Sequence, residues 1–90
     1  MIRVRVPAAD WTALSEFVAA QRVRQLGIQP AVQGAESSGT DRIIAFESAE
    51  AVRLLIERIN AYATTWDVRW AVSLNRVLPR LYGAISGPIE

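Results

Sequence analysis

The stretch WDVRWAVSL, residues 66–74, decides the fold class of this chain. Its even-numbered positions are all apolar: Trp66, Val68, Trp70, Val72 and Leu74. The odd-numbered positions that follow them are polar or small: Asp67, Arg69, Ala71, Ser73 and Asn75. Strict alternation over this length is typical of a β-strand with one buried face. The pattern therefore predicts a strand whose Trp70 points into the core, with Trp66 half exposed at its start.

The segments before this strand supply further elements. Residues 2–6, IRVRV, alternate and predict a strand that Pro7 ends, because proline cannot continue a central ladder. Residues 8–21 carry apolar side chains at helical spacing and predict a helix. A second helix is expected over residues 49–63, after Ser48, which is a favourable N-cap residue.

Two more strands are expected between the helices. Residues 26–33 alternate, and Pro30 among them favours an edge position in the sheet. The Gly/Ser-rich residues 34–41 predict a hairpin connection. The apolar run RIIAF, residues 42–46, predicts the next strand.

The expected order is therefore strand, helix, strand, strand, helix, strand. This order predicts an α+β fold, the ferredoxin-like βαββαβ plait, in which a four-stranded antiparallel sheet carries two helices on one face. Right-handed crossovers give the strand order 4-1-3-2. Residues 1–75 would form this domain. Residues 76–90 would form an apolar C-terminal extension that packs on the domain or on a partner.

Composition limits the chemistry that this chain can perform. The 90 residues carry a net charge of +1, all ten basic residues are arginine, and Lys, His and Cys are missing. The usual zinc sites and the Cys-His or Ser-His-Asp nucleophiles need those residues. We therefore expect a protein that is not an enzyme and has no cofactor and no metal. The all-arginine usage reflects either codon bias in a GC-rich, bacterial-type genome or selection for bidentate contacts to carboxylate or phosphate.

The sequence gives no sign of a membrane segment. No apolar run approaches the roughly 20 residues that a membrane-spanning helix needs. The N-terminal residues MIRVRVPAAD also lack the apolar region of a signal peptide. We expect a cytoplasmic protein that does not contact a membrane.

The open face of the predicted sheet is the first candidate binding surface. It would expose Arg3, Arg5 and Arg69, which are suited to contact an anion or a nucleic acid. RNA-binding sheets present outward aromatic side chains, and here the aromatics are expected to point inward, which disfavours nucleic acid. The small residues Ala71 and Ser73 on the same face would allow a second sheet to approach closely.

The C-terminal extension is the second candidate surface. Its apolar residues at helical spacing are Leu78, Leu81, Tyr82 and Ile85. An exposed apolar segment of this kind lowers solubility, so we expect it to be covered by the domain or by a partner chain.

Three functions agree with these patterns. The first is a small non-catalytic protein-interaction or oligomerisation module, an adaptor or regulatory subunit that forms a homodimer through the open sheet face, an edge strand or the C-terminal extension. The alternative is an arginine-based nucleic-acid-binding module that uses the open sheet face. The third is a ligand-binding or enzymatic dimeric α+β barrel, with Trp11, Tyr62, Trp66 and Trp70 lining a pocket.

Overall fold

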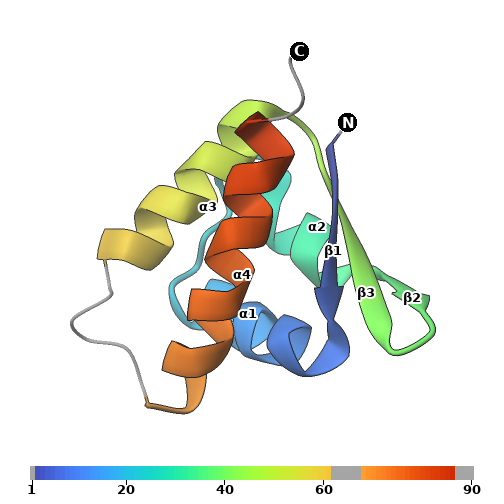
Figure 1. Cartoon of the computed structure of the whole chain (residues 1–90). Helices are drawn as coiled ribbons and strands as arrows, with labels where there is room; N and C mark the ends of the chain where they lie inside the picture. Colours follow the sequence, from blue (N-terminus) through green and yellow to red (C-terminus); the bar gives the residue numbers. More distant parts are fainter. Residues whose placement is uncertain (1, 62–67, 87–90) are drawn as a thin grey trace.

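The structure, a computed structural model, describes residues 2–61 and 68–86 (Figure 1). The strands in this part of the chain are β1 (Ile2–Pro7), β2 (Glu36–Ser38) and β3 (Asp41–Phe46). The helices are α1 (Ala8–Ala20), the 3₁₀ turn η1 (Gln25–Gly27), α2 (Ile28–Gln33), α3 (Ala49–Ala61) and α4 (Val68–Ser86). β3 is the central strand and pairs antiparallel with β1 on one side and with β2 on the other.

The core lies between one face of the sheet and the helices. β1 contributes Val4 and Val6 to it, and β3 contributes Ile44 and Phe46, because alternate residues of a strand point to the same face. The helices cover these residues with the following buried side chains: Leu14, Phe17, Val18, Ile28, Val32, Val52, Leu55, Ile59, Leu74, Val77 and Leu81. α4 packs against α1, α3 and β1, so it closes the core beside the first strand (Figure 1).

The predicted ferredoxin-like plait is wrong. The described residues form a three-stranded antiparallel sheet in the order β1-β3-β2, together with four α-helices. The stretch expected to be the fourth strand begins α4 instead, from Val68 onward. Val72, which the alternation placed in the core, is 60% exposed, whereas Leu74 is fully buried. Trp66 lies outside the described residues.

The strand expected over residues 26–33 is also wrong. Leu26 and Gly27 adopt left-handed backbone angles, with φ of 55° and 68°, and α2 begins directly after them. Pro30 is the third residue of α2, where a first helical turn tolerates proline because its missing N–H has no partner there. β2, one of the two edge strands of the sheet, lies inside the predicted hairpin connection instead.

The other elements are confirmed. β1, α1, β3 and α3 all form where the sequence predicts them, and the last two residues of the predicted second helix, 62 and 63, lie outside the described residues. Ser48 caps α3, since its Oγ accepts a hydrogen bond from the Ala51 backbone N–H at 3.3 Å. α4 continues through residues 75 and 76, where the domain was expected to end. Across residues 2–61 and 68–86, no helix has the length and apolarity that crossing a membrane requires.

Candidate functional site

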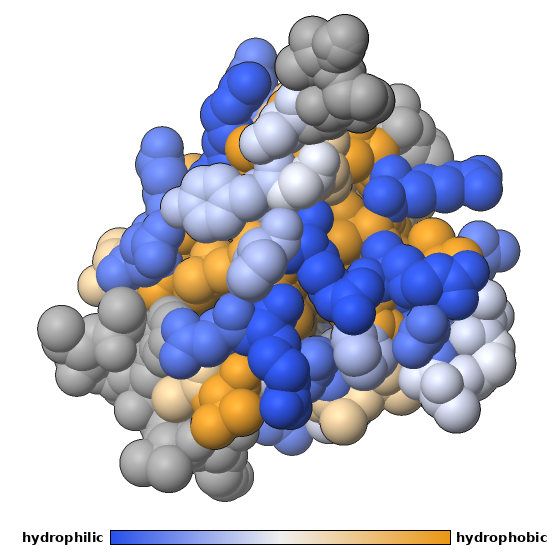
Figure 2. Space-filling view, in the orientation of Figure 1, coloured by the Kyte–Doolittle hydropathy of each residue, from blue (hydrophilic) through white to orange (hydrophobic). Residues whose placement is uncertain are grey.

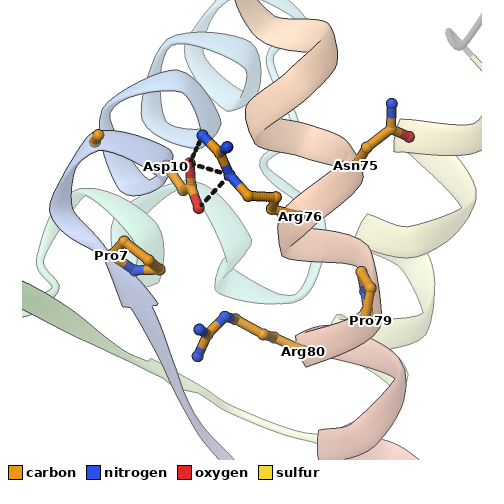
Figure 3. A pocket seen from close by; sticks show the side chains of 7 residues that line it. Pro7, Asp10, Asn75, Arg76, Pro79 and Arg80 are labelled. Atoms are coloured by element: carbon orange, nitrogen blue, oxygen red, sulfur yellow. Dashed lines mark hydrogen bonds and ion pairs between the residues drawn. The ribbon is translucent and has the colours of Figure 1, made fainter.

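A cleft of about 460 Å³ lies where the N-terminal turn of α1 meets the middle of α4 (Figure 3). The residues that line it come from the end of β1, from α1 and from α4: Pro7, Ala9, Asp10, Asn75, Arg76, Pro79 and Arg80. Figure 2 shows hydrophilic side chains gathered over α4 and β1, with hydrophobic surface visible between them. The cleft therefore combines charged groups with an apolar rim of proline and alanine.

Asp10 and Arg76 form the base of the cleft. Asp10 is 2% exposed, which makes it the one charged residue buried among those that the structure describes. Arg76 donates to both carboxylate oxygens, from Nε at 3.2 Å to each and from Nη2 at 2.9 Å to Oδ1. The hydrogen bonds from Arg76 to Asp10, and next the negative charge of Asp10, raise the pKa of the Arg76 guanidinium, although desolvation opposes them. Arg76 therefore stays charged.

Arg80 lies one helical turn beyond Arg76 and faces the same cleft. Its Nη1 donates to the backbone carbonyl oxygen of Arg5 at 2.9 Å. β3 pairs with the other edge of β1, so this contact tethers α4 to the free edge of the strand. Both guanidinium groups are consequently held in place by partners within the chain.

Pro79 lies inside α4, between these two arginines. Proline has no N–H, so residue 79 donates no helical hydrogen bond to the Asn75 carbonyl oxygen. Asn75 also lines the cleft, and Figure 3 shows its side chain directed away from the Asp10 carboxylate.

The charge of the cleft favours an anionic group. Its lining residues include two arginines, Arg76 and Arg80, and one carboxylate, Asp10, which leaves one net positive charge. The side chain of Arg76 is 59% exposed even though it binds Asp10, so part of its guanidinium remains available to solvent. In the described part of the chain, no group of three or more acidic side chains is placed to hold a metal ion.

The arginines expected on the open sheet face are not all together. Arg3 and Arg5 lie on β1 and are exposed, and Arg5 forms an ion pair with Asp41 at 3.2 Å. Arg69 belongs to α4 and so is not part of the sheet. Ala71 and Ser73 are half-buried residues of α4, and the expectation that they lie on a sheet face is wrong.

The predicted residues of the C-terminal extension all lie on α4. Leu81 is fully buried, Leu78 and Ile85 are half-buried and pack on the core, and Tyr82 is 47% exposed. The Tyr82 hydroxyl accepts a hydrogen bond from Asn60 Nδ2 at 3.4 Å. Leu81 thus packs inside the fold, and Tyr82 is the member of this set that solvent reaches most.

Two aromatic residues that were considered as pocket walls instead join helices to each other. Trp11 Nε1 donates to the Val32 carbonyl oxygen at 2.8 Å, and the Arg42 guanidinium lies 4.8 Å from the Trp11 ring centroid. Trp70 Nε1 donates to Glu16 at 3.0 Å, and its ring meets Phe17 edge-on. Tyr62 lies outside the described residues.

Asp10, Arg76 and Arg80 were not among the site residues predicted from the sequence. The available signal was the spacing of four between Arg76 and Arg80, which places both on one side of a helix. That signal becomes visible only when residues 68–86 are taken as one helix.

No protein-family model matches this sequence, and no curated protein or solved structure matches it either.

Proposed function

We propose that this chain is a non-catalytic protein-interaction module whose cleft between α1 and α4 binds an acidic segment of a partner protein. The observation that carries this proposal is the pair of anchored guanidinium groups. Asp10 holds Arg76, the Arg5 carbonyl holds Arg80, and both arginines line the same cleft.

Anchored arginines suit a carboxylate ligand. The planar guanidinium matches a carboxylate with two parallel N–H···O bonds. An arginine that is already fixed loses less side-chain entropy on binding than a free one. The apolar rim, which includes Pro7, Ala9 and Pro79, would contact the aliphatic part of a glutamate side chain. The cleft is open and shallow, which favours a side chain of a macromolecule over an enclosed small molecule.

A protein partner agrees better with the remaining surface than a nucleic acid does. The net charge is only +1, so long-range attraction to a polyanion is weak. On the sheet face that carries Arg3 and Arg5, the neighbouring strand presents Ile43 and Ala45, and the described residues of this face include no aromatic side chain for stacking. Nucleic acid is the alternative that the same experiment distinguishes.

The test is an NMR titration of the ¹⁵N-labelled chain with a glutamate-rich peptide. We expect shifts of the Arg76 and Arg80 side-chain signals and of the backbone at residues 7–10. Arg80→Gln should weaken binding about tenfold, the scale of one lost hydrogen bond to a charged group. Arg53→Gln, which removes an exposed arginine from α3, is the matched control and should change nothing.

Two results would count against the proposal. One is an absence of shifts around the cleft at millimolar peptide. The other is binding of a single-stranded oligonucleotide that shifts the same signals and weakens steeply with salt, while the peptide has no effect. The second result would indicate that the cleft binds nucleic acid and not an acidic segment of a protein.

A further inference from the structure

The sheet has a second face that the core does not use. Alternate residues of β1, β2 and β3 point to it, among them Arg3, Arg5, Glu36, Asp41, Ile43 and Ala45. We call this set the outer sheet face. Ile43 and Ala45 are partly exposed, and neither packs against the hydrophobic core. The described residues therefore leave an apolar strip along the middle of this face.

One row of side chains crosses all three strands of the outer sheet face. Ile43 of β3 is paired with Arg5 of β1 on one side and with Glu36 of β2 on the other. Neighbouring strands are separated by about 4.8 Å. Across the sheet, the row thus places a positive charge, an apolar side chain and a negative charge side by side in that order. Arg5 and Glu36 are both exposed.

This row is complementary to itself under a two-fold rotation. We propose that a second copy of this chain stacks on the outer sheet face, about a two-fold axis that runs along β3. The rotation places β3 on β3 and exchanges β1 with the partner's β2. Arg5 then faces the partner's Glu36, the partner's Arg5 faces Glu36, and the two Ile43 side chains meet at the axis. The same patch serves both copies, as a closed two-fold dimer requires.

The side chains of the outer sheet face fit the spacing of two stacked sheets. Aligned sheets pack about 10 Å apart with their strands within about 30° of each other. Ala45 is small and does not obstruct this approach, and Ile43 provides apolar contact at the centre. Asp41 remains on the other side of Arg5 at 3.2 Å, so the guanidinium would lie between two carboxylates. This surface lies outside the arginine cleft except at β1, so the inference goes beyond the proposed function.

The size of the face sets the strength of the dimer. Three short strands offer less than the roughly 800 Å² per partner of a stable interface. We therefore expect a weak, reversible dimer with a dissociation constant on the order of 10⁻⁴ M, and one that salt weakens further.

Charge reversal gives a sharp test by sedimentation equilibrium. Glu36→Arg places two arginine pairs in opposition, and Arg5→Glu places two glutamate pairs in opposition. Each variant alone should therefore be monomeric at about 1 mM. At this concentration, well above its expected dissociation constant, the wild type should be mostly dimeric. An equimolar mixture of the two restores an Arg–Glu pair at both contacts and should dimerise. Glu57→Arg, on the exposed side of α3, is the control and should dimerise like the wild type.

Circular dichroism of each variant checks that it folds. The inference is overturned if the wild type stays monomeric at this concentration. It is also overturned if either single variant dimerises as the wild type does, or if two folded variants remain monomeric when mixed. Arg80→Gln should leave dimerisation unchanged, so failure of the peptide proposal and failure of the dimer are separate results.

Discussion

Asp10 is a buried carboxylate, and within residues 2–61 and 68–86 its one charged partner is Arg76. A buried charge that loses its partner is strongly destabilising, because neither water nor protein then solvates it. We expect Arg76→Gln to lower the urea midpoint of unfolding clearly. Arg76→Lys should have an intermediate effect because it keeps the charge but loses the bidentate fork, and Arg80→Gln should lie close to the wild type. Equal midpoints for the two glutamine variants would contradict this role of Asp10.

The same pair predicts how the difference depends on pH. Asp10 raises the pKa of the Arg76 guanidinium in the folded chain. A group with a raised pKa contributes stability that is complete below its unfolded pKa and is lost only as the pH rises through the folded value. Arginine is protonated throughout the ordinary range. The urea midpoints of the wild type and Arg76→Gln should therefore differ equally at about pH 7 and about pH 9.

Two glycines should respond to alanine in opposite directions. Gly83 lies inside α4, and a Cβ added there would meet nothing within 4 Å. Alanine at this position should stabilise the chain by about 0.5–1 kcal/mol, since it restricts the unfolded state and favours a helix. Gly27 has a φ of +68°, and an added Cβ would approach the Glu47 carboxylate. Alanine there should cost about 1–2 kcal/mol. Thermal unfolding measures both changes.

At the scale of elements, both wrongly predicted strands have the same cause, which is the spacing of their apolar residues. A spacing of four is even, so it satisfies the period of a strand as well as the turn of a helix. Trp70 and Leu74 have this spacing in α4, and Ile28 and Val32 have it in α2. The residues that distinguish the two periods are Val72 and Leu26, and both are exposed. No residue property in the sequence marks them as exposed, because both are ordinary core-forming side chains.

The correctly predicted elements had patterns that only one period explains. In β1, Val4 and Val6 are separated by two residues and both are buried. In α3, Leu55 and Ile56 are adjacent and both are buried, which fits a helix and not a half-buried strand. The candidate site depended on α4, so the error in residues 68–75 also concealed the cleft. A site formed by side chains from two elements cannot be located until both elements have been assigned.

The helical register of α4 can be tested by substitution. Leu81 is fully buried, and its neighbour Tyr82 is 47% exposed. Leu81→Ala should cost about 2–5 kcal/mol, the usual cost of emptying a buried leucine site. Tyr82→Ala should cost much less, because the ring is about half exposed and its removal leaves only a small cavity in the core. Urea unfolding of the two variants gives both values. A larger loss for Tyr82→Ala would show that α4 presents a different face to the core.

At the scale of the whole molecule, α4 lies against β1, which is where the predicted plait placed its fourth strand. Either a helix or a strand can cover the free edge of β1, and local patterns do not decide between them. The helix adds contacts that a strand would not make. It packs on α1 and α3 and holds the Asp10 carboxylate through Arg76. The sequence interpretation treated residues 76–90 as an addition to a finished domain, whereas Val77 and Leu81 are part of the core.

This arrangement predicts that the chain cannot fold without the second half of α4. A chain that ends after residue 75 loses Val77 and Leu81 from the core and Arg76 from the buried carboxylate. A domain of this size has a free energy of unfolding of only about 5–15 kcal/mol. The loss of two buried apolar side chains, together with an unpaired buried charge, lowers it by most of that amount. We expect the shortened chain to show no cooperative thermal transition. A chain that ends after Ser86 keeps all of α4 and should unfold cooperatively. Cooperative unfolding of the shorter chain would mean that residues 1–75 form a core of their own.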